Sequence, residues 1–266
     1  MSQSIYFYFR RTIALLVLTI TLILSGGISA NKGLEIAKLS DKNNDGYGDS
    51  SSSMTMQLIN RKGDVVERKL AFKRLEVPEG GDKSIAVFES PRDVKGVAIL
   101  SYAHKVKSDD QWLYLPALKR VKRIASKNKS GPFLGSEFSF EDFSFQEVEK
   151  YEYSFTGEEA CKDSMCFVIE RRPLDLYSGY TKQLVWIDKE NYLVQKIYHY
   201  DRKSFHLKTQ TFEDYRLYQD FFWQPQKIKM INHQNGKSSI LLFEDVRLNT
   251  GFTDKDFSQN SLRRSR

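Results

Sequence analysis

Cysteine, long apolar runs and catalytic motifs are scarce in this sequence. Its 266 residues include only two cysteines, which excludes a scaffold built on several disulfides and a cysteine-rich zinc site. No run reaches the roughly 18 consecutive apolar residues that are typical of a membrane-spanning helix. The G-x-S-x-G, H-E-x-x-H, P-loop and G-x-G-x-x-G motifs are also missing, and the four histidines are isolated. We therefore predict neither an enzyme nor a cofactor.

Apolar and basic residues are what the chain does contain. Apolar residues make up 40% of the sequence and aromatic residues 13%, which is enough to bury a core. The net charge is +7. The densest basic cluster consists of Lys119, Arg120, Lys122, Arg123, Lys127 and Lys129, and three more arginines, Arg263, Arg264 and Arg266, lie at the C-terminus. If the protein is exported, such a cluster suits anionic lipid head groups or an acidic partner better than nucleic acid. A strand face exposed to solvent explains the cluster equally well.

Residues 1–30 have the features of a secretory signal peptide. They contain no acidic residue, and Arg10 and Arg11 precede an apolar stretch over residues 12–24 that is followed by small residues. A positive start, a short apolar segment and small residues before a cut define such a signal. We predict cleavage near Ala30, export to the periplasm, and one domain over residues 31–266. A retained anchor helix is the alternative, and the shortness of the apolar stretch disfavours it.

Most of the remaining chain alternates apolar and polar residues with a period of two. After a short helix-like start at residues 33–39, alternating runs predict about a dozen strands, and several are separated by hairpin-like spacers such as Gln234-Asn235-Gly236-Lys237. Successive hairpins without long helices between them predict a mainly β fold with one strongly curved antiparallel sheet. The runs lie at 54–58, 65–77, 85–89, 97–102, 111–115, 120–125, 148–155, 165–172, 183–188, 192–200, 207–215, 227–231 and 239–248.

One segment, residues 126–145, interrupts this rhythm. It contains Ser130-Gly131-Pro132 and five phenylalanines, and we predict a long loop with a helical turn near residues 140–145. An apolar loop of this kind either covers the concave side of a curved sheet as a plug or fills a core without any ligand. The sequence leaves both open.

The two cysteines, Cys161 and Cys166, lie between two strand-like runs and enclose four residues. In an oxidising compartment this spacing predicts a disulfide that closes a hairpin. A metal site is the weaker interpretation, because neither a histidine nor a third cysteine is nearby in the sequence.

An acidic stretch near the start of the domain resembles part of a calcium loop. Asp41, Asn43, Asp45 and Asp49 are spaced as in D-x-N-x-D-G-x-x-D, but Ser52 stands where a bidentate glutamate would be required. We therefore favour a connector whose side chains satisfy the backbone groups of turns over a weak ion site.

Several motifs together resemble one family. The run from Asp110 to Ile124, D-Q-W-L-Y-L-P-A-L-K-R-V-K-R-I, resembles the signature of LolA-like outer membrane lipoprotein-sorting proteins. G-S-E-F-S-F-E-D-F at residues 135–143 resembles that family's G-S-D-F-S-Y-E-D-L pattern, with Glu137 and Phe140 as mild departures. W-I-D-K-E-N-Y at 186–192 and F-E-D-V at 243–246 extend the match along the chain.

The resemblance implies an unclosed β half-barrel with a lid of helix and loop over an apolar cavity. It further implies a periplasmic carrier of lipoprotein acyl chains or another lipid, in transient contact with membranes, and an RND/MMPL-type transporter as a partner. A non-transporting periplasmic adaptor of an envelope transporter is the alternative. By alternation we expect the cavity lining to be Met54, Met56, Leu58, Leu70, Phe72, Trp112 and Tyr114, and the lid to present Phe138, Phe140 and Phe143. Packing in an ordinary core explains each of these residues about equally well.

Overall fold

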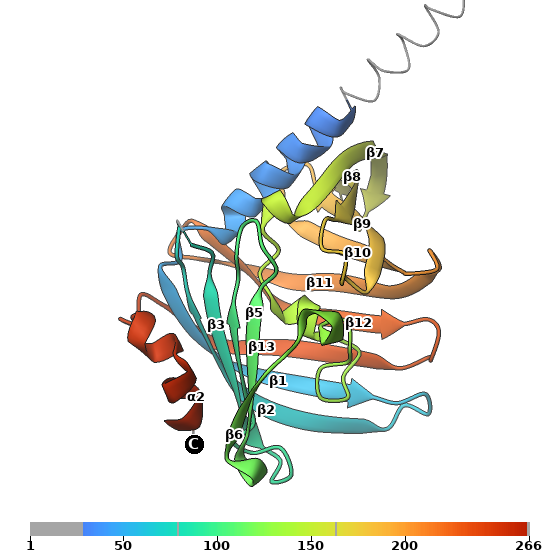
Figure 1. Cartoon of the computed structure of the whole chain (residues 1–266). Coiled ribbons are helices and arrows are strands. Elements are labelled where there is room, and N and C mark those ends of the chain that lie inside the picture. The colour runs from blue at the N-terminus through green and yellow to red at the C-terminus, as the bar shows by residue number, and fades with distance from the viewer. Residues whose placement is uncertain (1–28, 79, 163, 265–266) are drawn as a thin grey trace, which may run out of the picture.

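The chain folds around one antiparallel sheet of thirteen strands, shown by a computed structural model that describes residues 29–78, 80–162 and 164–264 (Figure 1). Along the sheet the strands follow the order β6-β5-β4-β3-β2-β1-β13-β12-β11-β10-β9-β8-β7. The predicted curved half-barrel is confirmed. The bounds are β1 Asp49–Ile59, β2 Val65–Leu75, β3 Lys83–Ser90, β4 Ala98–Tyr102, β5 Asp110–Leu115, β6 Arg120–Arg123, β7 Tyr151–Cys161, β8 Ser164–Pro173, β9 Tyr180–Asp188, β10 Val194–Asp201, β11 His206–Tyr218, β12 Phe222–Asn232 and β13 Ser238–Leu248.

Short hairpins determine this order, because each strand pairs with its neighbour in sequence on at least one side. One pairing joins strands that are far apart in the sequence: β1 pairs with β13, and Met54 lies opposite Phe243. This long-range pairing joins β2–β6 to β7–β12. The hairpin spacers at 61–64, 188–191 and 234–237 all lie between paired strands, as their turn residues predict.

The sheet does not close into a barrel. Within the described residues its two edge strands, β6 and β7, do not pair with each other. The chain between them, residues 124–150, contains the 3-10 turns η3 (Ser126–Asn128), η4 (Phe140–Phe143) and η5 (Val148–Lys150). Figure 1 shows this segment inside the curve of the sheet. We call residues 126–146 the lid; the predicted helical turn near 140–145 is confirmed as η4.

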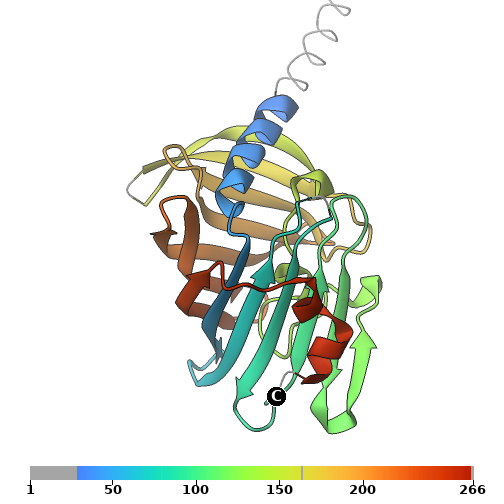
Figure 2. The ribbon, with the colours of Figure 1, turned by 90° about the vertical axis from the view of Figure 1, so that its left-hand side faces the viewer.

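Side chains from the concave face form the largest apolar cluster. It includes Met54, Met56, Leu70, Phe88 and Leu241, and the lid adds Phe133 and Phe138. Because successive side chains of a strand point to opposite faces, the same strands also support a second cluster on the convex face. The C-terminal helix α2 (Gln259–Arg264) covers that face, and its Leu262 and the preceding Phe257 are fully buried against β3–β6 (Figure 2).

The N-terminal helical residues, 29–41, pack against the other half of the sheet. Ile36 and Ala37 join a cluster with Ile169, Val185 and Ile187. Gly33 is required there, since a Cβ atom at this position would lie 2.7 Å from the backbone carbon of Ser154. The predicted signal peptide lies almost entirely outside the described residues. No helix in the described ranges is long and apolar enough to cross a membrane.

The remaining sequence predictions are located by the structure. A disulfide between Cys161 and Cys166 closes the β7–β8 hairpin, as predicted. In the calcium-like stretch, the Asp49 carboxylate accepts hydrogen bonds from the backbone N–H groups of Thr250 and Gly251, so it holds the loop after β13. No group of three or more metal-ligating side chains occurs in the described parts of the chain. Lys119, Arg120 and Lys122 lie exposed on the β5–β6 hairpin at the edge of the sheet.

Candidate functional site

The concave face of the sheet contains an apolar cavity of about 220 Å³ that adjoins the lid and is partly open to solvent. β1 and β2 contribute Met54 and Phe72, and the lid contributes Phe138, Phe143 and Phe145. The opposite wall comes from β11–β13 and consists of Phe212, Trp223, Pro225, Ile228, Leu241 and Phe243. Since both halves of the sheet and the lid build the cavity, only the folded half-barrel can create it.

Ten residues were predicted for this site, and the structure brings four of them to the cavity: Met54, Phe72, Phe138 and Phe143. Four others belong to the surrounding apolar cluster without lining the cavity, namely Met56, Leu58, Leu70 and Phe140. The last two, Trp112 and Tyr114, require a correction. They lie on the convex face, in the cluster that contains Phe257 and Leu262.

The error for β5 has a simple physical origin. Strand alternation fixes which residues share a face, but it does not say which face is concave. In β5 the residues that face the concave cluster are Leu113 and Leu115. Aromatic Trp112 and Tyr114 instead pack on the outer side, where Trp112 meets Tyr102 with ring centroids 5.0 Å apart.

The sequence prediction missed the whole β11–β13 wall. Leu241 and Phe243 alternate in the same way as the β1 residues that were chosen, so their pattern offered a signal. The alternation does not reveal that β13 pairs with β1, and this pairing places Phe243 opposite Met54. Phe243 also meets Phe72 edge to face, at 6.4 Å between ring centroids.

One end of the cavity is polar and contains a partly buried arginine. The Arg74 guanidinium donates to Ser50 Oγ at 3.2 Å and to Gln224 Oε1 at 2.9 Å, and it stacks over the ring of Tyr47. Burial lowers the pKa of Arg74. Arg74 therefore marks the point where the apolar lining ends.

Beyond Arg74 lies a second cavity of about 450 Å³ with acidic walls. Asp41, Asp45 and Asp82 line it, together with Glu147 and Glu149 from the segment after the lid. Burial, and then the negative charge of Asp45 and the other three carboxylates, raise the pKa of Asp41 to about 7. Arg74 and Phe145 line both cavities, so the two adjoin.

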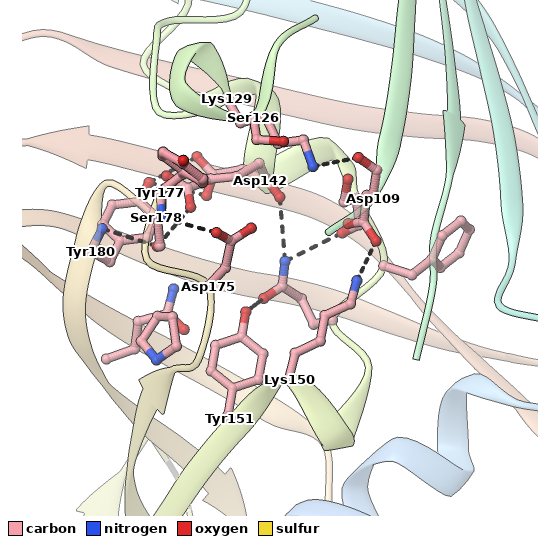
Figure 3. A pocket seen from close by; sticks show the side chains of 16 residues that line it. Asp109, Ser126, Lys129, Asp142, Lys150, Tyr151, Asp175, Tyr177, Ser178 and Tyr180 are labelled. Atoms are coloured by element: carbon pink, nitrogen blue, oxygen red, sulfur yellow. Dashed lines mark hydrogen bonds and ion pairs between the residues drawn. The ribbon is translucent and has the colours of Figure 1, made fainter. Parts of the chain in front are cut away.

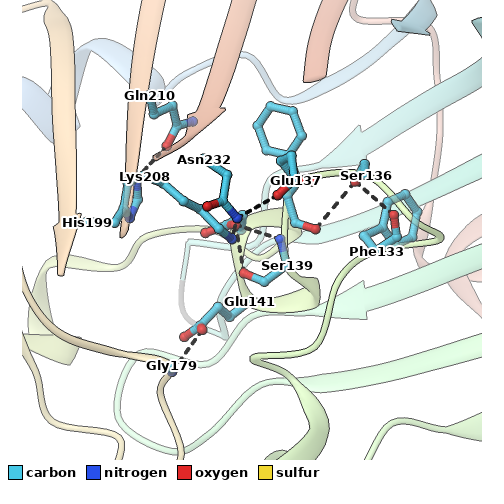
Figure 4. A network of polar contacts seen from close by, with 12 residues as sticks. Phe133, Ser136, Glu137, Ser139, Glu141, Gly179, His199, Lys208, Gln210 and Asn232 are labelled. Atoms are coloured by element: carbon cyan, nitrogen blue, oxygen red, sulfur yellow. Dashed lines mark hydrogen bonds and ion pairs between the residues drawn. The ribbon is translucent and has the colours of Figure 1, made fainter. Parts of the chain in front are cut away.

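A buried polar network fastens the lid to β9 and β11 (Figure 4). The Asp142 carboxylate accepts a hydrogen bond of 3.0 Å from the Tyr180 hydroxyl and one of 2.7 Å from the Ser139 hydroxyl. The buried Lys208 ammonium lies 4.0 Å from the same carboxylate and donates to Tyr180 at 3.3 Å. Ser139 and Asp142 also form the capping box of η4, so the network fixes the helical turn of the lid.

His199 lies beside this network, and its imidazole ring is neutral. Gln183 Nε2 lies 2.9 Å from its Nδ1, and its Nε2 lies 3.1 Å from Gln210 Oε1. A neutral ring with its proton on Nε2 satisfies both contacts, since it accepts at Nδ1 and donates at Nε2. Burial lowers the pKa of His199 to about 4.

A second lid contact involves the β8–β9 loop, residues 174–179. The Glu141 carboxylate accepts hydrogen bonds from the Ser178 hydroxyl at 2.8 Å and from the Gly179 backbone N–H at 2.9 Å. Burial, followed by the negative charge of Asp142, raises the pKa of Glu141 to about 7. We call this pair of hydrogen bonds the Glu141 latch.

The latch borders a small polar pocket of about 60 Å³ (Figure 3). On one side are Tyr177 and Ser178, and on the other Lys150 forms an ion pair with Asp109. The arrangement as a whole is an apolar cavity beside a lid that polar contacts and buried phenylalanines hold in place, and such a cavity can accommodate a hydrocarbon chain.

Comparison with known proteins gives consistent matches. A family model described as "Uncharacterized protein" matches residues 80–264. The chain is similar to a crystal structure of a domain described as an outer membrane lipoprotein-sorting protein from Vibrio parahaemolyticus, with 48% identity over 88% of this chain and 99% of that chain and a TM-score of 0.86. No curated protein matches.

Two further solved structures share the fold. A DUF1329 family protein from Desulfovibrio piger is 27% identical, with 88% of this chain and 99% of that chain covered and a TM-score of 0.83. A LolA superfamily protein from Nitrosomonas europaea is 21% identical over the same shares of the two chains, with a TM-score of 0.69. At that identity the likeness concerns the fold alone.

Proposed function

Because this chain belongs to the LolA-like outer membrane lipoprotein-sorting family, we propose that it is a periplasmic carrier that encloses the acyl chain of a lipoprotein or another lipid. The observation that carries the proposal is the apolar cavity between β1–β2, β11–β13 and the lid. Each methylene group of an acyl chain that leaves water gains about 0.8 kcal/mol. An apolar cavity that a lid can cover is therefore what a lipid carrier in an aqueous compartment has to provide.

Loading and release require the cover to move. The lid is held by side-chain contacts rather than by strand pairing with the sheet: the Glu141 latch, the Asp142 network, the hydrogen bonds of Glu137 and the packing of the lid's phenylalanines. It can therefore open while the strand pairing of the sheet stays intact. A carrier also has to let go of its cargo, which favours a lid that is only moderately stable in its closed state.

The proposed location follows from the N-terminal sequence. Residues 1–30 would direct export and be removed near Ala30, leaving residues 31–266 as the carrier domain. The disulfide between Cys161 and Cys166 supports an oxidising compartment. Membership of a lipoprotein-sorting family supports the prediction that the chain is not an enzyme.

An RND/MMPL-type transporter remains our proposed partner on the resemblance alone. The cavity itself favours a carrier over a non-transporting adaptor, since an adaptor needs no apolar hollow under a movable cover.

The test is lipid binding by the purified protein. Mass spectrometry of the native protein should detect co-purifying lipid, and a fluorescent long-chain fatty acid should bind to lipid-free protein. Ile228→Trp fills the cavity from β12 and should weaken binding of the fatty acid on the order of tenfold, because the indole takes the space of several methylene groups.

Lys229→Trp is the matched control. It makes a similar increase in size one position further along β12, on the opposite face of the strand, and should leave binding unchanged. If lipid-free protein fails to bind the fatty acid, or if both variants bind it as well as the wild type, the carrier proposal is wrong.

A further inference from the structure

The two most exposed apolar side chains of the described residues, Leu176 and Val106, lie in two loops. In the β4–β5 loop, residues 103–109, Val106 is 90% exposed. In the β8–β9 loop, Leu176 is 95% exposed, and its neighbours Leu174 and Tyr177 are each more than half exposed. Leaving such side chains in water forgoes the free energy of burying them, so a cluster of them indicates an interaction surface.

These two loops are held together and held in shape. Ser108 Oγ donates to Asp175 Oδ2 at 2.7 Å, which joins the loops close to Val106 and Leu176. Asp175 Oδ1 in turn accepts the Tyr177 backbone N–H at 2.9 Å. Arg202 braces the loop from below by donating to the carbonyl oxygens of Tyr177 and Ser178. The apolar side chains therefore point outward from an ordered support.

The charge around the loops is mostly positive. Lys105 and Lys107 flank Val106, and Arg172 and Arg202 lie on either side of the β8–β9 loop; all four are exposed. Arg172 also pairs with Glu170, and Lys105 donates to the Pro78 carbonyl oxygen. Of the acidic residues in the same two loops, Asp175 is bonded to Ser108 and Asp109 is paired with Lys150. Exposed apolar residues, a tyrosine and surrounding cations are the combination that interfacial membrane anchors use against anionic lipids.

We propose that residues 105–107 and 174–177 form a docking surface for an anionic phospholipid membrane. Val106, Leu176 and Tyr177 enter the head-group region, and the surrounding positive charge attracts the lipid phosphates. The rigid support favours this shallow insertion, because the loops lose little conformational freedom on docking.

The same surface is connected to the lid. Ser178 and Gly179, the two donors of the Glu141 latch, directly follow the docking residues 174–177 (Figures 3 and 4). Docking that displaces the two joined loops as one rigid unit moves both donors relative to Glu141. Docking then weakens the latch and favours opening of the cavity where a membrane is present to give or receive lipid.

This inference deepens the proposed carrier function, and only its coupling to the lid depends on that function. Membrane docking is measured by co-sedimentation of the purified protein with vesicles of phosphatidylcholine, alone or mixed with phosphatidylglycerol. We expect binding to the anionic vesicles that weakens with added salt, and little binding to the neutral ones.

Two variants test the surface. Val106→Ser combined with Leu176→Ser should reduce vesicle binding on the order of tenfold or more, because both apolar contacts are lost. Lys105→Glu combined with Lys107→Glu should weaken binding and flatten its salt dependence. Both double variants should bind the fluorescent fatty acid in solution as the wild type does, which separates a failure of docking from a failure of the carrier proposal.

The basic β5–β6 hairpin supplies the control. Leu118, which is 62% exposed, lies beside Lys119 and Arg120 at its turn. Leu118→Ser with Lys119→Glu makes comparable changes there and should leave vesicle binding in place. Loss of binding in this variant but not in the loop variants would overturn the proposal, as would equal binding by all of them. If the protein binds neither the neutral nor the anionic vesicles, the proposal is also overturned, and an acidic protein becomes the candidate partner.

Discussion

The backbone N–H of Gly179 donates a hydrogen bond of 2.9 Å to the carboxylate of Glu141, which lies 38 positions earlier in the chain. Glu141 belongs to η4 in the lid, and Gly179 directly precedes β9. The contact therefore joins the cover of the cavity to the wall of the sheet. Because side-chain contacts and packing hold the lid while backbone ladders hold the strands, the lid can open without breaking any strand pairing, at a smaller cost than unfolding.

Gly179→Ala should push the lid away from the sheet. A Cβ atom at this position would lie 2.7 Å from the Ser130 Cβ and 2.8 Å from Glu141 Oε1. Both separations are shorter than a van der Waals contact allows. The lid therefore has to shift, and the hydrogen bonds of the Glu141 latch become longer. We expect faster hydrogen exchange in residues 130–143 and a loss of stability of about 1–2 kcal/mol. Unchanged exchange in the lid would show that Gly179 does not set its position.

Glu141→Gln should remove a pH dependence of lid opening. The pKa of Glu141 is raised to about 7 in the closed state, above its ordinary value of 4.5, so between these values the closed state binds a proton that the open state releases. The closed lid is accordingly favoured at lower pH, and opening becomes easier as the pH rises through 7. A protonated carboxyl group keeps one accepting oxygen for Gly179, and its hydroxyl can donate to Ser178; glutamine reproduces both contacts.

The measurement compares hydrogen exchange of η4 in the wild type and Glu141→Gln at about pH 4, where both states of the wild type are mostly protonated, and at about pH 8. The two proteins should agree at the lower pH, and the wild type should exchange faster at the higher pH. Asp142 and Lys208 face Glu141 in both proteins, so the comparison cancels their effects. A wild-type lid that opens more readily at the lower pH would contradict the assignment.

Global stability should follow a different pH course. The folded-state pKa of His199 is lowered to about 4, so the unfolded chain takes up a proton below its ordinary pKa of 6.5 while the folded protein does not. Stability attributable to His199 is therefore lost as the pH falls from 6.5 towards 4. His199→Gln should reduce this loss in denaturant titrations. A steeper decline of stability with acid in the variant would contradict a neutral buried imidazole.

Phe72→Ser and Trp112→Ser should separate the two faces of the sheet. Phe72 lines the cavity, whereas Trp112 packs on the convex face against Tyr102. Each substitution should cost about 2–4 kcal/mol of stability because a large side chain is truncated. Only Phe72→Ser should also weaken binding of the fluorescent fatty acid. Equal losses of affinity in the two folded variants would refute the correction made for β5.

Replacing the disulfide should loosen the β7–β8 hairpin. Cys161 and Cys166 close a short loop, and Cys166 is fully buried beside Val168 and Trp186. On the chain-entropy model the double serine variant loses about 2 kcal/mol. Denaturant titration of the wild type with and without reductant should show a similar change. Thiol labelling of the native, unreduced protein should modify neither cysteine.

Local sequence patterns were sufficient to predict the strands of this protein. Alternation and turn residues such as Asn235-Gly236 predict the hairpins, because each depends on residues close together in the chain. The spacing of Cys161 and Cys166 predicted their disulfide for the same reason. The helical turn at Phe140–Phe143 was also predictable, since Ser139 and Asp142 cap it locally.

Only the tertiary structure decided which face of each strand is concave and what covers it. The alternation at Trp112 and Leu113 is compatible with either residue on the concave face. The pairing of β1 with β13, which curves the sheet, decides that Leu113 faces inward. The Glu141 latch and the joining of Ser108 to Asp175 connect segments far apart in sequence. Hydrophobic periodicity has no information on such pairs, because a side chain's period fixes its face within one element, whereas the neighbour across a cavity depends on the path of the whole chain.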